Sequence, residues 1–360
     1  MKKIKLFDPV IGISEEREII KILRSGFWAS GSGSGKVQEF EKKFSKYLNS
    51  DQCVAVNSGT AALNLALSLL DIKNKEVILP SLSFVATAHA VTLNGGKPVF
   101  ADVDSETLCI DPKQIMKLIT KKTAAILPVH FAGIACNLNE ISQICQENNI
   151  KLIEDAAHAA GTKYDGRKIG SHSMAVCFSF HPVKNLGMPT GGLISINHVN
   201  HRKLKKILNE KRWCGITNRH GFTYDVKHVG WNYYMNEFSA GLGLIQLKKL
   251  DNLNRIRRNI AKRYYNEIEL EQKMPYIAGS SYHFYWIITR NRDKIMQKLK
   301  QNGIETGIHY RPIHKMTMYN TTNKLPITEN IGKNIISLPT HPNLSEKDVS
   351  RVISLVNKFI

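Results

Sequence analysis

Short apolar runs alternate with helical patterns through the first 250 residues of the chain, and each run ends where polar residues begin. An Ala- and Leu-rich stretch from Ala61 to Leu70 predicts one of the helices. The runs are Glu76–Leu79, Lys97–Ala101, Ala124–Val129, Lys151–Ile153 and Ala175–Phe180. This alternation is typical of an α/β fold with a mostly parallel sheet covered by helices on both faces. Ligands of such sheets bind beyond the carboxyl ends of the strands, so the residues after each run are the functional candidates.

The pattern changes after Leu247, where a long basic helix is expected to run to about Glu271. The segments that follow predict a strand, a helix, a second strand and a final helix, at His283–Thr289, Asp293–Asn302, Glu305–His309 and Glu346–Phe359. We therefore expect a large domain over residues 1–250 and a smaller C-terminal α/β domain over residues 251–360.

The composition is that of a globular protein, with 42% hydrophobic and 22% charged residues. These fractions exclude disordered and fibrous classes. No apolar run reaches the ~18 residues of a membrane span, and the N-terminus has no signal-peptide pattern. The six cysteines form no CxxC pair, which argues against a zinc site or a disulfide framework and predicts a cytoplasmic protein.

The chain is strongly basic: it has 50 Lys and Arg residues and 30 Asp and Glu residues, which gives a formal net charge of +20. The densest basic stretch, His201 to Lys211, is interrupted by apolar positions at helical spacing. We interpret it as the solvated face of a helix and do not expect nucleic-acid binding. A basic surface also suits phosphorylated small molecules.

A possible phosphate site lies at Ser58-Gly59-Thr60, where an expected strand over Cys53 to Val56 meets a helix. Backbone N–H groups and the helix dipole at such a turn bind anions. The same residues equally fit an ordinary helix N-cap, so this segment alone decides nothing.

A carboxylate and a lysine follow two of the other strands. Asp155 ends a strand and precedes His158; it is placed either to hold a cationic ring nitrogen or to cap the next turn. Lys184 follows the run ending at Phe180; a lysine in apolar surroundings can act as a nucleophilic amine, although most loop lysines are only solvated.

Together the three features fit one ligand. Pyridoxal 5'-phosphate requires a phosphate cradle, a carboxylate at its pyridine nitrogen and a lysine for its aldehyde. The chain offers them in that order, each after a strand, with 29 residues from Asp155 to Lys184.

Nearly end to end, the sequence resembles the DegT/DnrJ/EryC1/StrS family of pyridoxal-phosphate-dependent sugar aminotransferases. Each motif is weak alone, but many occur in the family's order. They are Val37–Glu41, Ser58–Leu63, Pro80–Thr87, Pro128–His130, Glu154–His158, Ser179–Asn185, Tyr224–Val226, Gly230–Tyr233, Gly303–Ile304, His309–His314 and Ser337–Pro339. The resemblance implies the aspartate-aminotransferase-like fold (fold type I).

The resemblance also implies roles at matched positions. Lys184 would bond to the cofactor aldehyde and move the proton, and Asp155 would keep the ring nitrogen protonated. Phe84 would stack on the ring, and His158 would lie by the phenolic oxygen; a core role is the alternative for both. The expected phosphate ligands are Gly59, Thr60, Ala61, Ser179 and, from the neighbouring subunit of a homodimer, Asn232. His309 and Tyr310 would lie near the substrate or be structural.

Three departures from the family pattern concern the substrate. Thr190 stands where Glu is common before the double glycine, and Tyr234 stands where Arg is common after Asn-Tyr. The run Gly31-Ser32-Gly33-Ser34-Gly35 is unusually rich in glycine and is not a P-loop.

The leading hypothesis is transfer of an amino group from an amino acid, most often L-glutamate in this family, to a keto sugar, usually nucleotide-linked. One alternative is a sugar dehydratase of the same fold, but those relatives have His where this chain has Lys184. A non-catalytic regulatory member is another, and it would be expected to have lost Lys184 or Asp155.

Overall fold

A seven-stranded sheet forms the centre of the computed structural model, which describes residues 3–360. The strand order is β1-β9-β8-β5-β4-β2-β3, and β9 alone runs antiparallel to its neighbours. The bounds are β1 Gln52–Val56, β2 Glu76–Pro80, β3 Lys97–Ala101, β4 Thr123–Ile126, β5 Lys151–Asp155, β8 Ala175–Ser179 and β9 Gly192–Ile196. The apolar runs of the sequence therefore form strands, as predicted, and the predicted α/β fold with a mostly parallel sheet is confirmed.

Helices cover both faces of this sheet, because both faces of its strands are apolar. Successive residues of β1 show the alternation: Cys53 and Ala55 pack with α2, whereas Val54 and Val56 pack with α3. The face of the sheet that includes Val54 is covered by α3 Gly59–Leu67, α4 Ala86–Leu93 and α7 His201–Arg212. The opposite face, which includes Cys53, is covered by α2 Lys36–Leu48, α6 Leu138–Glu147 and part of α8 Glu237–Glu267. Helices α1 Ile13–Ser25 and α5 Pro112–Leu118 lie at the periphery.

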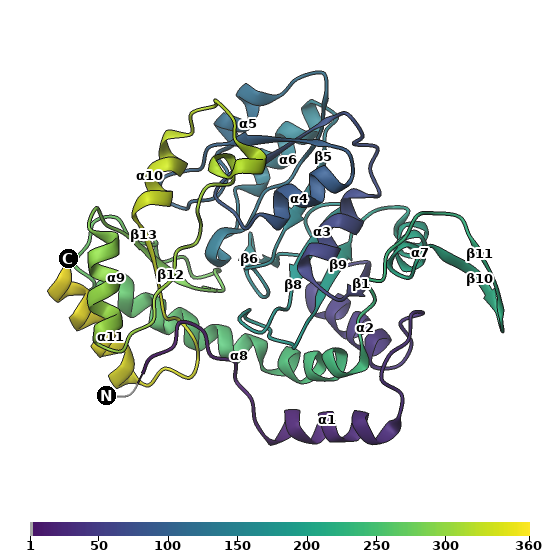
Figure 1. Cartoon of the computed structure of the whole chain (residues 1–360), viewed down its shortest axis with the longest axis horizontal. Helices are drawn as coiled ribbons and strands as arrows, with labels where there is room; N and C mark the ends of the chain where they lie inside the picture. Colours follow the sequence, from purple (N-terminus) through teal and green to yellow (C-terminus); the bar gives the residue numbers. More distant parts are fainter. Residues whose placement is uncertain (1–2) are drawn as a thin grey trace.

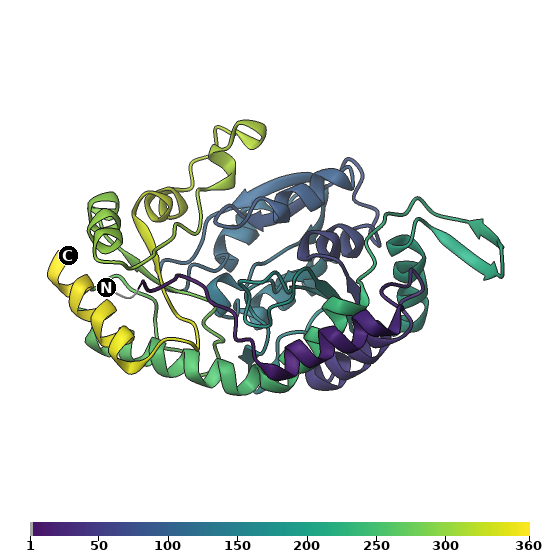
Figure 2. The same cartoon turned by 60° about the horizontal axis from the view of Figure 1, so that its bottom comes forward.

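The C-terminal part forms a second layer beside the sheet (Figure 1). Strand β12 Tyr285–Ile288 pairs antiparallel with β13 Ile335–Leu338. Around this pair lie α9 Arg292–Gln301, α10 Pro326–Asn334 and α11 Glu346–Phe359. Two short 3-10 turns, Ile313–Lys315 and Thr317–Tyr319, pack instead against the central sheet beside α4. Helix α8 passes from the sheet to this layer without a break at 250 (Figure 2), and the predicted division there stays a prediction.

One predicted element was wrong, and the predicted start of another was too late. The segment Glu305–His309 is not a strand, because its one pairing among the described residues is the single bridge of Gly307 with Ser337; the bridge of Ile304 with Ile4 lies just before it. The partner of β12 is β13 instead. Helix α8 begins at Glu237, before the predicted Leu247, because two glycines in its first turns weakened the helical pattern of the sequence there. A Cβ on Gly241 would lie 2.4 Å from Ile22 Cδ1, and one on Gly243 would lie 2.1 Å from Met188 Cε, so close packing requires these glycines.

Close packing also explains the glycine run before α2. A Cβ on Gly31 would lie 2.0 Å from Trp213 Cε2, and one on Gly33 would lie 1.9 Å from Arg212 Nη2. Gly33 also has φ +72°, which disfavours any side chain. The run therefore lies directly against the end of α7.

A long hairpin, β10 Ile216–His220 with β11 Thr223–Val226, projects from the rest of the chain (Figure 1). A smaller one joins β6 Lys163–Tyr164 to β7 Arg167–Lys168, and a 3-10 turn covers Phe131–Gly133. The basic stretch His201–Lys211 is helical as predicted. Within residues 3–360, none of the helices combines the length and the apolar character that crossing a membrane requires.

Candidate active site

A cavity of about 340 Å³ opens at the carboxyl ends of β5 and β8, beside the start of α3. This is the edge at which parallel strands of an open α/β sheet place a ligand. Most of the predicted site residues line it, namely Gly59, Thr60, Phe84, Asp155, His158, Ser179, Lys184, His309 and Tyr310. Ala61 and Asn232 are not among the residues around it.

The turn before α3 has the geometry of an anion site. Ser58 caps the helix, and its Oγ accepts a hydrogen bond from the Ala61 N–H at 3.1 Å. The N–H of Ala61 is thus already engaged, whereas those of Gly59 and Thr60 belong to the first turn and have no acceptor within the helix. A Cβ on Gly59 would lie 2.6 Å from Ser179 Cβ. The glycine therefore lets Ser179 approach the turn, and both predicted readings of this segment, cap and anion site, are compatible.

Asp155 is the last residue of β5 and is buried. Its Oδ2 accepts a hydrogen bond from Thr87 Oγ1 at 2.9 Å, and its Oδ1 accepts one from the Ala157 N–H at 3.0 Å. Burial raises the pKa of Asp155, and the two hydrogen bonds and the charge of Lys184 oppose that rise. Asp155 thus caps the next turn, as the simpler reading held, and also faces the cavity.

Lys184 lies on the loop after β8, with its Nζ 3.4 Å from His283 Nε2. Burial lowers the pKa of Lys184 to about 8, against the opposing attraction of Asp155. The next residue holds the loop: Asn185 Nδ2 donates to Asn254 Oδ1 and to the Ser281 carbonyl. A fixed lysine with a lowered pKa has the properties of a nucleophilic amine.

Phe84 is not a core residue, because 57% of it is exposed beside the cavity. Its ring centroid lies 6.1 Å from that of Tyr310. An exposed aromatic ring at the edge of a cavity is available to cover a planar ligand.

His158 is buried, as the core reading expected, and yet it lines the cavity. Its Nδ1 accepts a hydrogen bond from the Ala132 N–H at 3.3 Å, and its Nε2 lies 3.0 Å from Tyr310 Oη. Burial holds the pKa of His158 well below its usual value, so the ring is neutral. Because Nδ1 accepts, the proton is on Nε2, which donates to Tyr310.

His309 and Tyr310 reach the cavity from the C-terminal layer. His309 Nδ1 lies 2.8 Å from Ser337 Oγ, and its ring stacks on Phe284 with centroids 4.6 Å apart. Burial and the charge of Lys184 lower the pKa of His309 to about 4, and burial raises the pKa of Tyr310. Both side chains are therefore neutral at neutral pH.

Sequence reasoning missed Thr87 and His283. Thr87 lies in the matched segment after β2, three residues beyond Phe84 and in the first turn of α4, and its place in that segment was a usable signal. His283 precedes β12, and no local pattern connects it to Lys184.

Two of the departures from the family pattern have structural partners. Thr190 Oγ1 donates a hydrogen bond to the Asn57 carbonyl, and Tyr234 forms a β-bridge with Val56.

The residues present fit pyridoxal phosphate. A buried carboxylate ends β5, a lysine with a lowered pKa follows β8, and a Cβ would fill the small space between Gly59 and Ser179. The donor set therefore matches a ligand with an anionic group, a cationic ring nitrogen and an aldehyde.

Comparisons with known proteins agree with this geometry. The sequence model of the DegT/DnrJ/EryC1/StrS aminotransferase family matches residues 9–357. Uncharacterized protein MJ1066 of Methanocaldococcus jannaschii is 34% identical over 98% of this chain and 97% of its own.

Solved structures are similar over the whole length as well. Spr1654 of Streptococcus pneumoniae in its PMP form has a TM-score of 0.94 at 28% identity, covering 99% of this chain and 97% of that one. PseC of Helicobacter pylori, an aminotransferase involved in the biosynthesis of pseudoaminic acid, has a TM-score of 0.93 at 28% identity and covers 99% of both chains.

Proposed function

The chain belongs to the DegT/DnrJ/EryC1/StrS aminotransferase family and is a pyridoxal-phosphate-dependent aminotransferase, and from that premise we propose that it transfers an amino group from L-glutamate to a nucleotide-linked keto sugar. The observation that carries the proposal is that Asp155 and Lys184 line one cavity together with the Gly59 turn. A sugar dehydratase of this family would be expected to have His at position 184. A non-catalytic regulatory member of the family would not need both the Asp155 carboxylate and the Lys184 amine.

The residues divide the chemistry between them. Bound pyridoxal phosphate supplies an aldehyde that bonds to amines and a ring that takes up electrons. With the cofactor bound, Asp155 would hold a proton at the ring nitrogen through its carboxylate. Lys184 Nζ would carry the proton that leaves the donor carbon, and burial of the amine lowers its pKa toward neutrality. The Gly59 and Thr60 N–H groups and the Ser179 hydroxyl would hold the phosphate.

The neutral groups at the cavity orient the substrates. Phe84 would cover the cofactor ring. The Nε2–H of His158 donates to Tyr310 and so fixes the phenol at the cavity. His309 presents a neutral imidazole at the same wall. We assign both His309 and Tyr310 to the sugar-binding side.

The nucleotide linkage is supported by charge. The net charge of +20 favours a doubly anionic substrate, although it does not choose among nucleotides. The projecting hairpin adds Arg219 and His220, both exposed, near its tip.

We propose a homodimer in which each subunit completes the other's site. Asn232 is exposed and does not line its own chain's cavity. The hairpin next to it bears Phe222, which is fully exposed, and Tyr224, 59% exposed. Apolar groups on a projecting hairpin are suited to burial against a second copy. The proposed compartment is the cytoplasm, since all six cysteines are free.

The test is an absorbance spectrum of the purified protein with pyridoxal phosphate, before and after addition of L-glutamate. We expect a near-visible band that gives way to the shorter-wavelength absorption of pyridoxamine phosphate, and a band that returns when the accepting keto sugar is added. Lys184→Ala is expected to show no such band. A wild-type protein that stays colourless with pyridoxal phosphate would contradict the proposal.

A further inference from the structure

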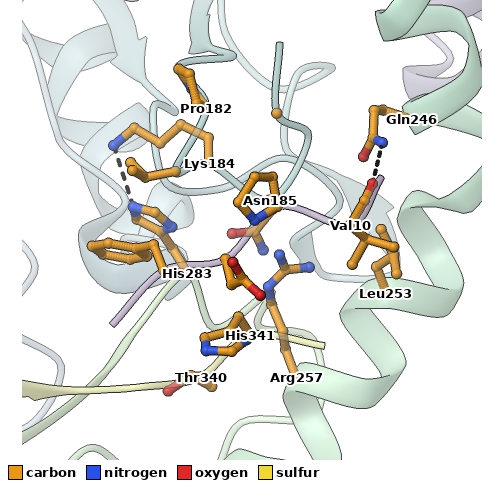
Figure 3. Close-up of a pocket in the computed structure, with 15 residues that line it drawn as sticks. Val10, Pro182, Lys184, Asn185, Gln246, Leu253, Arg257, His283, Thr340 and His341 are labelled. Carbon is orange, nitrogen blue, oxygen red and sulfur yellow. Dashed lines mark hydrogen bonds between the residues drawn. The ribbon is translucent and has the colours of Figure 1, made fainter. Parts of the chain in front are cut away.

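A second, smaller cavity lies beside the candidate active site and shares Lys184 with it (Figure 3). The N-terminal segment from Phe7 to Val10, the loop after β8, helix α8 and the segment after β13 enclose it. Its volume is about 10 Å³, which is close to the least that holds one water molecule.

His283 connects this cavity to Lys184. Its Nε2 lies 3.4 Å from Lys184 Nζ, as the dashed line in Figure 3 shows, and its ring is 3% exposed. The ring is fixed between Phe7, with stacked centroids 5.2 Å apart, and His158, at 4.7 Å. Burial and the charge of Lys184 hold the pKa of His283 well below its usual value, so the ring is neutral. Since Nε2 faces the lysine amine as an acceptor, the proton of the ring is on Nδ1.

Three buried polar atoms around the cavity have no hydrogen-bond partner in the described chain: His283 Nδ1, Asn185 Oδ1 and His341 Nδ1. The first is a donor. Asn185 Oδ1 is an acceptor, because its Nδ2 is held by two oxygens. His341 Nδ1 is also an acceptor, because its Nε2 lies 2.9 Å from the Lys5 carbonyl and must donate there. Buried polar atoms of this kind are usually satisfied by ordered water.

Arg257, from α8, adds a second donor. It is 6% exposed, and its Nη1 donates to Asn254 Oδ1 at 3.5 Å. No carboxylate among residues 3–360 forms an ion pair with it; Asp8, which also lines the cavity, is engaged by Lys5 and Asn343. Burial without a counter-charge lowers the pKa of Arg257 to about 9. Its remaining N–H groups are available to the cavity.

We propose that the cavity binds one water molecule, which accepts hydrogen bonds from His283 Nδ1 and Arg257 and donates to Asn185 Oδ1 and His341 Nδ1, and that His283, oriented in this way, is a positioning residue for the Lys184 amine. Two donors and two acceptors match the full hydrogen-bonding capacity of a water molecule. The inference rests on the proposed function, in which Lys184 binds the cofactor.

The effect on Lys184 has a definite sign. A neutral acceptor at His283 Nε2 stabilises the protonated lysine more than the neutral one, so removing it lowers the pKa of Lys184. Asp155 also raises the pKa of Lys184, and the lysine charge lowers the pKa values of His158, His181 and His309; these four residues are unchanged in the His283 variants. His283 itself is faced by His158, His309 and Arg257 as well as by Lys184.

The first experiment measures how fast the cofactor-free full-length protein takes up pyridoxal phosphate, by the rise of near-visible absorbance, as a function of pH. We expect His283→Phe to move the midpoint of this profile down by about one pH unit, the size of a hydrogen bond to a charged group. His283→Gln, which offers an oxygen acceptor near the position of Nε2, should restore the midpoint. His172→Phe, a histidine outside both cavities, is the matched control and should not move it.

The outcomes separate this inference from the proposed function. Uptake by Lys184→Ala equal to wild type would overturn the role of Lys184 itself. A lysine-dependent uptake with the same midpoint in His283→Phe and wild type, or equal shifts in the Phe and Gln variants, would overturn the positioning role alone.

A crystal structure of the holoenzyme tests the water. We expect an ordered water in contact with His283 Nδ1, Asn185 Oδ1, His341 Nδ1 and the Arg257 guanidinium. A cavity without ordered water, or a water that does not reach His283, would overturn the inference.

Discussion

Thr87 Oγ1 donates a hydrogen bond to Asp155 Oδ2 across 2.9 Å, so a hydroxyl from the first turn of α4 fixes the carboxylate that ends β5. Asp155 is buried, and burial alone favours its protonated form. The hydroxyl therefore supports the ionised carboxylate that a cationic ring nitrogen requires.

The Thr87→Val variant should lose this support. We expect turnover to fall about tenfold, because a hydrogen bond to a charged group is worth about 1.5 kcal/mol or more. Thr87→Ser keeps the hydroxyl and should stay within about twofold of wild type on the same ground. Steady-state rates with L-glutamate and a keto-sugar acceptor provide the measurement, and equal losses in both variants would show that only the methyl group matters.

The lowered pKa of Lys184 predicts a pH-dependent stability in the cofactor-free protein. The pKa is about 8 in the folded chain, against about 10.4 in an unfolded one, so the unfolded state binds more protons between these values. Folding stability attributable to Lys184 should therefore rise as the pH increases through that window. We expect the wild type to gain about 2 kcal/mol over Lys184→Met, after allowance for the partial exposure of the amine.

Urea unfolding of both proteins near the two ends of the window measures this difference. The Met variant removes the titrating group and keeps a side chain of similar length, so contributions from all other groups cancel. Curves that stay parallel across the window would show that the amine is as well solvated in the folded state as in the unfolded state.

The buried pair of Arg212 and Glu41 predicts a large loss of stability. Arg212 Nη1 lies 2.6 Å from Glu41 Oε1 and 2.8 Å from the Ala55 carbonyl. Arg212→Met removes the buried partner of the Glu41 carboxylate and leaves Lys205, 3.4 Å from its Oε2, as its one ion-pair partner among the described residues. Removing one partner of a buried ion pair costs about 3–5 kcal/mol. Lys43→Ala removes an exposed pair with Glu39 and should cost at most about 0.5 kcal/mol. Chemical denaturation of the two variants makes the comparison, and similar midpoints would contradict it.

A subunit-mixing experiment tests the shared site. Dimers that combine one Lys184→Ala subunit with one Asn232→Ala subunit should contain one intact and one doubly defective site if Asn232 acts across the interface. An equal random mixture is then expected to recover about a quarter of wild-type turnover, since half of the dimers are mixed and each has one working site. Failure to exceed the activity of the two parents would place Asn232 in its own subunit's site.

The strands of the central sheet were predictable because they are buried on both faces and therefore read as short apolar runs bounded by polar residues. The run Lys97–Ala101 coincides with β3 to the residue. The segment 305–309 has only one apolar residue, Ile308, and among the described residues it pairs only through the single bridge of Gly307 with Ser337.

The site was predictable to the extent that its residues follow strands. Asp155 and Lys184 stand at strand ends, where topology alone brings side chains together. His283 comes to Lys184 from a position 99 residues later, through the packing of the C-terminal layer. That contact depends on the angle between two parts of the fold, which no sequence pattern records.

The glycine run before α2 bears on how this chain tolerates sequence change. Surface loops usually accept substitution more readily than any other segment. Here a methyl group at residue 31, 33 or 35 would collide with an indole, a guanidinium or a carboxylate, those of Trp213, Arg212 and Glu237. A scan of all single substitutions should therefore find this loop about as intolerant as the interior of the sheet, and natural variants of the protein should be sparse there.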